Sequence, residues 1–302
     1  MSLHESEEIT PPEDSALLAQ SLPGHFRSEQ VQVNGTRLHY VVGGQGEPLV
    51  LLPGWPQTWW QYHKVMPSLA TRYQVIAVDL RGMGDSDKPQ SGYDKRTMAG
   101  DIHELVGHLG YREVNIAGHD IGAMVAFSFA VNYPAVTRKV ALLDVAHPDE
   151  SYYQLLLLPR SGQQVHMWWF AFNQVRGLPE HLLAGRYRYL IDWLFDHTLT
   201  NPKAIDEYDR RIYERAYAHP DAIRSSNGWY QAFGQDIEDQ KAYGTVNAPM
   251  LMLASEGNYE YLNSLLPGKG NDVRVTRVAG SGHYLADEQP AAVVDLLAKF
   301  FG

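Results

Sequence analysis

The chain contains no cysteine among its 302 residues. Disulfides, thiolate-bound metals and a cysteine nucleophile are therefore excluded, and the redox compartment stays undetermined. The sequence also has no apolar segment long enough to span a bilayer and no long basic run. With a formal net charge of −10, it gives no sign of nucleic acid or an anionic membrane as its main partner.

The first residues lack the features of a secretory signal. Residues 1–15 are acidic, include two consecutive prolines, and have neither a positively charged start nor an apolar run. We therefore expect a cytoplasmic protein. The hydrophobic content of 44% suits one catalytic domain with an insertion better than several small domains.

What the sequence does contain is a regular alternation of short apolar strands and amphipathic helices. Strands are expected from residue 29, with a hairpin turn at Asn34-Gly35, and at residues 49–52, 75–79, 113–117, 139–144, 250–254 and 273–278. Helices are expected at residues 15–21, 97–109, 123–133 and 290–301. This order predicts an α/β fold with a mostly parallel, doubly wound sheet that helices cover on both faces.

Residues 146–244 interrupt the alternation. They show helical patterning without a clear strand, and they are rich in aromatic side chains. We expect a helical insertion whose aromatic residues form its own core and also cover the sheet edge as a lid over an apolar pocket. The predicted organisation is a partly flexible lead-in at 1–27, a core of residues 28–145 and 245–302, and a helical cap, here called the lid, at 146–244.

Residues 118–122, Gly-His-Asp-Ile-Gly, have the pattern of a nucleophile elbow with Asp120 in the place of the usual serine. Glycines at 118 and 122 would avoid clashes in a sharp turn between strand and helix. Asp120 is ionised at neutral pH and can displace a leaving group from a saturated carbon, which forms an ester. The alternative is a chance Gly-x-Asp-x-Gly turn, so the prediction depends on finding partner residues elsewhere.

An ester on Asp120 must be hydrolysed, which requires a base that activates water. His283 is the best candidate, because it lies in a glycine-rich loop after the last predicted strand. Reactive groups collect at the carboxyl ends of strands in such sheets. The base in turn needs an acid, for which we prefer Asp144, with Glu256 in reserve. Asn258 stands where many such folds have an aspartate.

Negative charge that develops during ester hydrolysis needs hydrogen-bond donors. The backbone N–H groups of Trp55 and Ile121 are the expected donors, since both follow strand ends near the elbow. A cis peptide bond between Trp55 and Pro56 would help to aim this loop.

Together these residues resemble the α/β-hydrolase fold, in particular its epoxide hydrolase and dehalogenase branch, over roughly residues 29–302. The resemblance rests on residues 53–56, 79–87, 118–122, 144 and 282–283. It implies a catalytic triad of Asp120 as nucleophile, His283 as base and Asp144 as acid. It also implies no cofactor, no metal, and a small apolar electrophile and water as the partners.

The lid carries a second resemblance. In related epoxide hydrolases and fluoroacetate dehalogenases, one lid segment carries a histidine that binds the leaving group, and residues 168–173 are similar to that segment. A second lid segment of these enzymes carries a tyrosine that acts together with the histidine, and residues 228–231 are similar to it. Tyr230 matches that tyrosine, whereas Trp169 replaces the histidine. The residues expected to bind the substrate or leaving group are Trp168, Trp169 and His166.

Three hypotheses follow from these residues. In the first, Asp120 opens an epoxide ring, Tyr230 and Trp169 stabilise the departing oxygen, and water activated by His283 releases a vicinal diol. In the second, a haloalkane dehalogenase-type reaction, the halide needs hydrogen bonds but no proton, which suits Trp169 and Tyr230. The third is a non-catalytic or lyase-like descendant that binds a ligand. We rank epoxide hydrolysis first, and name a homodimer as the oligomeric state to test.

Overall fold

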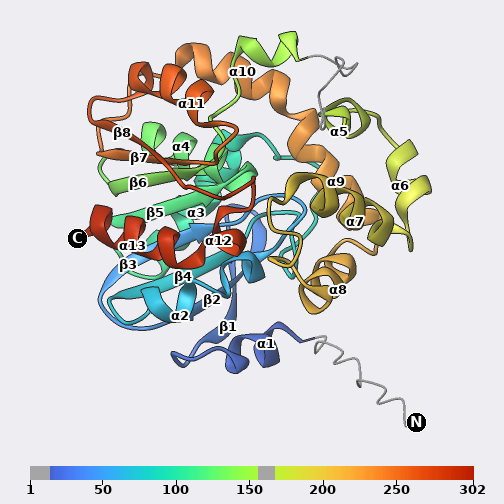
Figure 1. Cartoon of the computed structure of the whole chain (residues 1–302), viewed down its shortest axis with the longest axis horizontal. Coiled ribbons are helices and arrows are strands. Elements are labelled where there is room, and N and C mark those ends of the chain that lie inside the picture. The colour runs from blue at the N-terminus through green and yellow to red at the C-terminus, as the bar shows by residue number, and fades with distance from the viewer. Residues whose placement is uncertain (1–13, 156–166) are drawn as a thin grey trace.

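An eight-stranded sheet forms the centre of the computed structural model, which describes residues 14–155 and 167–302 (Figure 1). The strand order is β1-β2-β4-β3-β5-β6-β7-β8. The strands are β1 (Arg27–Val33), β2 (Thr36–Gly43), β3 (Glu47–Leu52), β4 (Tyr73–Asp79), β5 (Val114–His119), β6 (Thr137–Leu143), β7 (Met250–Ala254) and β8 (Val273–Arg277). Only the pairs β1–β2 and β2–β4 are antiparallel, which confirms the mostly parallel sheet.

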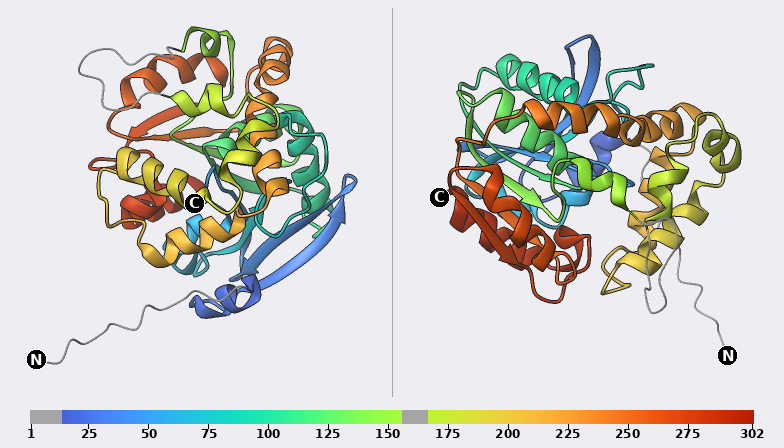
Figure 2. Two further views of the ribbon diagram at one scale, coloured as in Figure 1. Left: turned by 90° about the vertical axis from the view of Figure 1, so that its right-hand side faces the viewer. Right: turned by 90° about the horizontal axis from the view of Figure 1, so that it is seen from above.

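Helices cover both faces of this sheet, as a parallel sheet requires. They are α1 (Ser15–Ser21), α2 (Met66–Leu69), α3 (Lys95–His108), α4 (Ile121–Asn132), α11 (Tyr259–Leu265), α12 (Leu285–Glu288) and α13 (Pro290–Phe301). Helices α3 and α4 pack together on one face, and α2 and α13 pack together on the other (Figure 2). Helix α4 is buried over most of its surface, because it lies between α3 and the strands.

The described elements between β6 and β7 are all helical. They are η2 (Glu150–Gln154), α5 (Trp168–Phe172), α6 (Leu178–Leu183), α7 (Tyr187–Thr198), α8 (Glu207–Ala216), α9 (Pro220–Gln231) and α10 (Phe233–Ala242). Helices α5 to α9 stand at one end of the sheet (Figure 1), in agreement with a helical lid, although the domain boundaries stay a prediction. His166 lies outside the described residues. In the two described ranges, no helix has the length and apolar character needed to cross a membrane.

A fully buried ion pair joins the lid to the core. The Nζ atom of Lys95, at the start of α3, donates to Asp236 Oδ2 of α10 at 2.8 Å and to the carbonyl oxygen of Trp229 in α9 at 2.5 Å. The Lys95 backbone N–H also donates to Asp236 Oδ1. Helices α9 and α10, and with them Tyr230, are therefore held in one position relative to α3.

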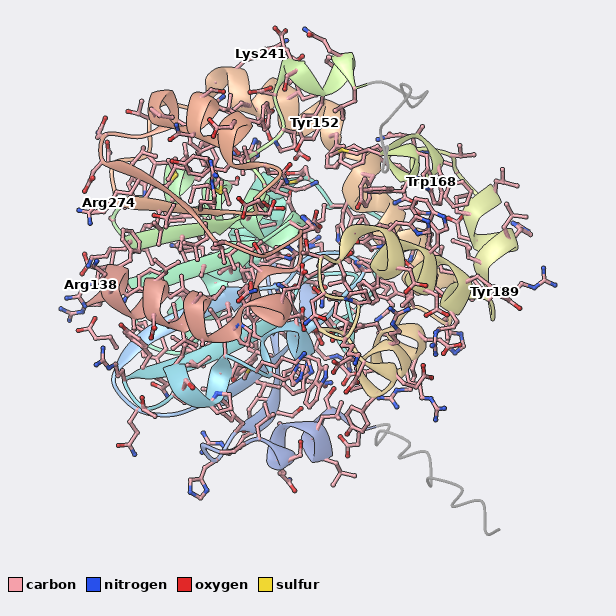
Figure 3. All side chains as sticks on the ribbon, in the orientation of Figure 1. Arg138, Tyr152, Trp168, Tyr189, Lys241 and Arg274 are labelled. Carbon is pink, nitrogen blue, oxygen red and sulfur yellow. The ribbon has the colours of Figure 1, made fainter. Side chains whose placement is uncertain are left out.

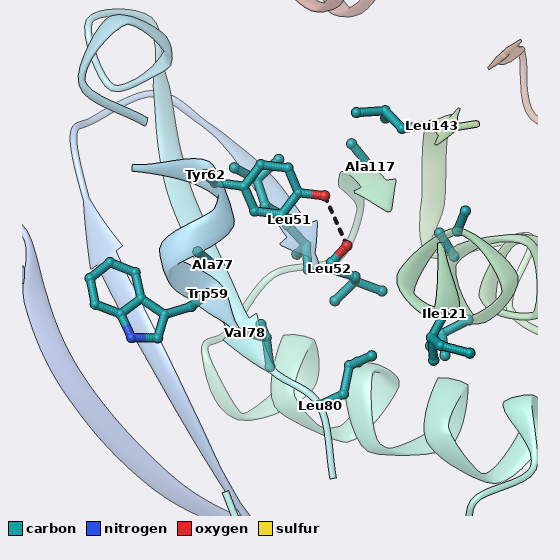
Figure 4. Close-up of a cluster of buried hydrophobic side chains, with 14 of the residues drawn as sticks. Leu51, Leu52, Trp59, Tyr62, Ala77, Val78, Leu80, Ala117, Ile121 and Leu143 are labelled. Atoms are coloured by element: carbon teal, nitrogen blue, oxygen red, sulfur yellow. Dashed lines mark hydrogen bonds between the residues drawn. The ribbon is translucent and has the colours of Figure 1, made fainter. Parts of the chain in front are cut away.

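A buried tyrosine joins the short helix η1 (Trp59–Tyr62) to the end of β3. The Tyr62 hydroxyl donates to the carbonyl oxygen of Leu52 at 2.8 Å, inside a cluster of buried apolar side chains (Figure 4). This bond fixes the last residue of β3, directly before the loop that carries Trp55.

Candidate active site

Asp120 occupies the sharp turn between β5 and α4. Its backbone angles, φ 51° and ψ −120°, lie in a region that non-glycine residues rarely adopt. A Cβ atom on Gly118 would lie 2.1 Å from the Gly122 carbonyl oxygen, and a Cβ atom on Gly122 would lie 2.1 Å from that of Leu52. The two glycines are therefore required by steric contact, and they present Asp120 at the start of a helix, where a negative charge is favoured.

Two backbone N–H groups meet the Asp120 carboxylate. The Trp55 N–H donates to Asp120 Oδ1 at 2.9 Å, and the Ile121 N–H helps to lower the pKa of the same carboxylate. Trp55 itself is held by the lid, because its indole Nε1 donates to the Tyr187 hydroxyl at 2.8 Å. The peptide bond between Trp55 and Pro56 is cis. Both expected oxyanion donors thus lie at the carboxylate of Asp120.

His283 lies between two carboxylates. Its Nε2 is 3.6 Å from Asp120 Oδ2, and its Nδ1 is 2.9 Å from Asp144 Oδ2. Burial alone would lower the pKa of His283, but the hydrogen bonds and charges of Asp120 and Asp144 outweigh it and raise the pKa to about 10. Burial likewise opposes ionisation of Asp120, but its contacts with His283 hold the pKa of Asp120 below the ordinary value. In the free protein the pair is therefore imidazolium and carboxylate.

Asp144 directly follows β6 and is 2% exposed. Its Oδ1 accepts a hydrogen bond from the Ser255 N–H at 2.7 Å, and its Oδ2 accepts one from Asn258 Nδ2 at 2.9 Å. Asn258 thus orients Asp144, the acid that lies next to His283. In the sequence, the one sign of this role was that Asn258 stands where many such folds have an aspartate. Glu256, the reserve acid, is instead exposed and pairs with Arg277.

His119, the residue before the proposed nucleophile, contacts His283. Its ring is fully buried, and its Nε2 lies 2.8 Å from the His283 carbonyl oxygen. Since a carbonyl can only accept, Nε2 carries the hydrogen. Burial and the neighbouring His283 ring lower the pKa of His119 to about 4, so it is neutral at physiological pH. His119 therefore holds the backbone of His283 without adding a charge.

Tyr230 reaches the site from helix α9. Its ring makes edge contacts with Trp55, Phe170 and Phe233 at centroid distances of 5.4, 5.4 and 5.2 Å. Within residues 14–155 and 167–302, no hydrogen bond to its hydroxyl occurs. Burial raises the pKa of Tyr230 well above its ordinary value. The hydroxyl therefore stays protonated and keeps its donor free.

The two predicted tryptophans lie together on helix α5. Trp169 packs against Trp168, Phe170 and Trp193 at 6.2, 6.1 and 6.4 Å. Figure 3 labels Trp168 on the lid. The ring of α5 that contacts Tyr230 is Phe170. Substrate binding by Trp168 and Trp169 therefore stays a prediction.

Metal ligands are not grouped near these residues or elsewhere in the part of the chain that the structure describes. No three histidine, aspartate or glutamate side chains of residues 14–155 and 167–302 come together in a way that could hold an ion.

The fold agrees with that of known hydrolases. Residues 47–290 match the family described as alpha/beta hydrolase fold. The chain is 34% identical over 280 residues to a soluble epoxide hydrolase from Corynebacterium sp. (strain C12), with 90% of this chain and 96% of that protein covered. It is 28% identical over 292 residues to a fluoroacetate dehalogenase from Burkholderia sp, with 91% and 93% covered.

A solved structure shows the same relationship. Epoxide hydrolase CorEH without ligand superposes with a TM-score of 0.82 at 33% sequence identity, over 92% of this chain and 99% of that one. The predicted fold and the predicted enzyme class are confirmed. The chain belongs to the alpha/beta hydrolase fold family, and it is a hydrolase related to epoxide hydrolases and to a dehalogenase.

Proposed function

We propose that this protein opens an epoxide to a vicinal diol through a covalent ester on Asp120. The observation that carries the proposal is the placement of His283 between Asp120 and Asp144, at 3.6 and 2.9 Å. A second support is the 34% identity to a soluble epoxide hydrolase. Asp120, His283 and Asp144 form the proposed catalytic triad.

In the first step, a carboxylate oxygen of Asp120 attacks a ring carbon of the epoxide. The carbon–oxygen bond of the ring breaks, and its electron pair stays on the departing oxygen. Tyr230 donates a hydrogen bond and then its proton to that oxygen, since its hydroxyl has no other partner among the described residues. The product of this step is an uncharged ester.

In the second step, His283 activates water. Once Asp120 is esterified, one of the two negative charges that raise the pKa of His283 is gone. The imidazolium therefore loses a proton, and the Tyr230 phenolate left by the first step takes up a proton in its place. Neutral Nε2 then takes a proton from water, and the hydroxide attacks the ester carbonyl carbon. The Trp55 and Ile121 N–H groups stabilise the oxyanion. The ester bond breaks, and the diol leaves with the proton from His283.

A haloalkane is the second candidate substrate. The free hydroxyl of Tyr230 could bind a departing halide, which needs no proton, and the chain is 28% identical to a fluoroacetate dehalogenase. A substrate with its own carboxylate is disfavoured, because Ile121 and Met124 next to Asp120 are apolar and supply no cation. A small apolar electrophile therefore fits best; a homodimer and a cytoplasmic location stay predictions.

Steady-state assays on styrene oxide-like epoxides beside bromoalkanes test this proposal. We expect diol formation from the epoxides, and no activity in Asp120→Ala, which should still fold because the carboxylate lies in a partly exposed site. Turnover of the bromoalkanes alone would show that a haloalkane, and not an epoxide, is the substrate. Activity retained in Asp120→Ala would show that another residue is the nucleophile.

A further inference from the structure

Two loops that are far apart in the sequence meet beside His283. We call residues 280–284 the base loop, and residues 199–206, which join α7 to α8, the lid connector. A Cβ atom on Gly282 would lie 2.5 Å from the carbonyl oxygen of Thr198, at the end of α7. The backbone of the lid therefore rests directly on the backbone of the base loop.

Glu288, the last residue of α12, bridges these two loops. Its Oε1 accepts a hydrogen bond from the Gly282 N–H at 2.9 Å. Its Oε2 accepts two more, from the N–H groups of Thr200 at 2.7 Å and Asn201 at 2.9 Å. One oxygen is thus committed to the base loop and the other to the lid connector.

The carboxylate of Glu288 interacts with backbone donors rather than with a cation. The side chain belongs to a residue that is 7% exposed, and no ion pair joins it to a residue of the described ranges. A buried carboxylate is costly unless hydrogen bonds replace its hydration. Burial raises the pKa of Glu288, and the N–H groups of Asn201, Thr200 and Gly282 oppose that rise. The buried carboxylate of Glu288 therefore depends on the N–H groups of the two loops.

We propose that Glu288 is a positioning residue for His283. By tying the base loop to the lid connector, it sets where His283 Nε2 meets the water that attacks the ester on Asp120. This inference rests on the proposed function. Attack by Asp120 needs no base because its carboxylate is already ionised, whereas hydrolysis needs His283. Glu288 should therefore affect the hydrolysis step and leave the alkylation step alone.

Single-turnover and steady-state kinetics of Glu288→Gln test the proposal. Glutamine keeps one acceptor oxygen but turns an NH2 group toward one of the two loops, so one loop loses its acceptor. We expect hydrolysis of the alkyl-enzyme to slow roughly tenfold or more, since small misplacements of a catalytic group are costly, with alkylation unchanged. Mass spectrometry should then find the ester on the Asp120 peptide during turnover.

Glu256→Gln is the matched control. Glu256 also accepts an N–H of the base loop, that of Gly280 at 3.3 Å, but its side chain is 57% exposed and has no bond to the lid connector. Both steps should keep their rates in this variant. Glu288→Asp is a second test that retains the charge; one methylene shorter, it cannot span both loops, and hydrolysis should again slow selectively.

The outcomes separate this inference from the proposed function. Equal slowing of both steps, or slowing that only follows a loss of thermal stability, would make Glu288 a merely structural residue and overturn the proposal. Unchanged hydrolysis in folded Glu288→Gln and Glu288→Asp would also overturn it. If His283→Gln traps the ester and the Glu288 variants do not, only the positioning role fails. If no variant ever carries an ester, the covalent mechanism and the positioning role both fail.

Discussion

The charge on Asp120 should control the protonation state of His283. In the free protein the two groups lie 3.6 Å apart, and His283 has a pKa raised to about 10. The substitution Asp120→Asn keeps the shape of the side chain but removes its charge, so it imitates the neutral ester. We predict that the pKa of His283 falls in this variant.

The size of this effect follows from the distance between the two groups. At the observed 3.6 Å, two unit charges interact by about 2 kcal/mol at an effective dielectric constant of about 40. The dielectric constant is this high because the His283 side chain is 24% exposed, so that solvent weakens the interaction. The acid dissociation constant of the imidazolium should therefore rise roughly 30-fold, since about 1.4 kcal/mol corresponds to a factor of ten.

Titration of ring-labelled histidines by NMR measures the change. The chain has 13 histidines, so the spectrum of His283→Gln identifies the signal. Glu256→Gln is the control, because it removes an exposed carboxylate that does not contact His283. Mass spectrometry confirms that the amide at position 120 is intact. A pKa of His283 that is unchanged or higher in Asp120→Asn would refute the charge coupling on which the second step depends.

Three further predictions concern single groups. Tyr230→Phe should slow epoxide opening by about two orders of magnitude, as expected for loss of a proton donor, and slow bromoalkane opening less; stopped-flow kinetics compares the two. Lys95→Met leaves the Asp236 carboxylate buried and unpaired, which should lower the free energy of unfolding by about 3–5 kcal/mol in urea titrations, with partial recovery in Lys95→Met/Asp236→Leu. Since the pKa of His283 is raised on folding, its stabilising contribution should be full below pH about 6.5 and be lost as pH rises through about 10. The difference in melting temperature between the unmodified protein and His283→Gln should shrink over that range; a constant difference would contradict it.

Much of the fold was predictable because the strands are short apolar runs between turn residues. Where bounds were predicted, they differ from the observed bounds by at most two residues, and those of α1, β7 and α13 are identical. No bounds were predicted for the separate helices between β6 and β7. The short helices α2 and α12 were not predicted. With 4 residues each, they contain little more than one turn, too little for a periodic apolar pattern to show.

The approach of Asp120, Asp144 and His283 was predictable for a topological reason. Each follows the carboxyl end of a strand in a parallel part of the sheet, and such ends share one edge. The direction of single side chains was not predictable in the same way. One step along a helix turns the side chain by about 100°, so the sequence of α5 could not tell that Phe170 rather than Trp169 contacts Tyr230.

The hydrogen bonds that hold Asp144 and His283 in place could not be predicted from the sequence either. Asn258 reaches Asp144 from a segment more than a hundred residues away, and His119 reaches the backbone of His283 across a similar distance. Such contacts depend on packing rather than on a local pattern.

The central claim, a covalent ester on Asp120, is tested most directly by one turnover in water labelled with oxygen-18, with enzyme in excess over a styrene oxide-like epoxide. Water attacks the carbonyl carbon of the ester, so the diol leaves with an original oxygen of Asp120. We predict an unlabelled diol and one atom of oxygen-18 in the Asp120 peptide. A labelled diol from an enzyme whose Asp120 peptide stays unlabelled would mean that water attacks the epoxide directly, and would contradict the account.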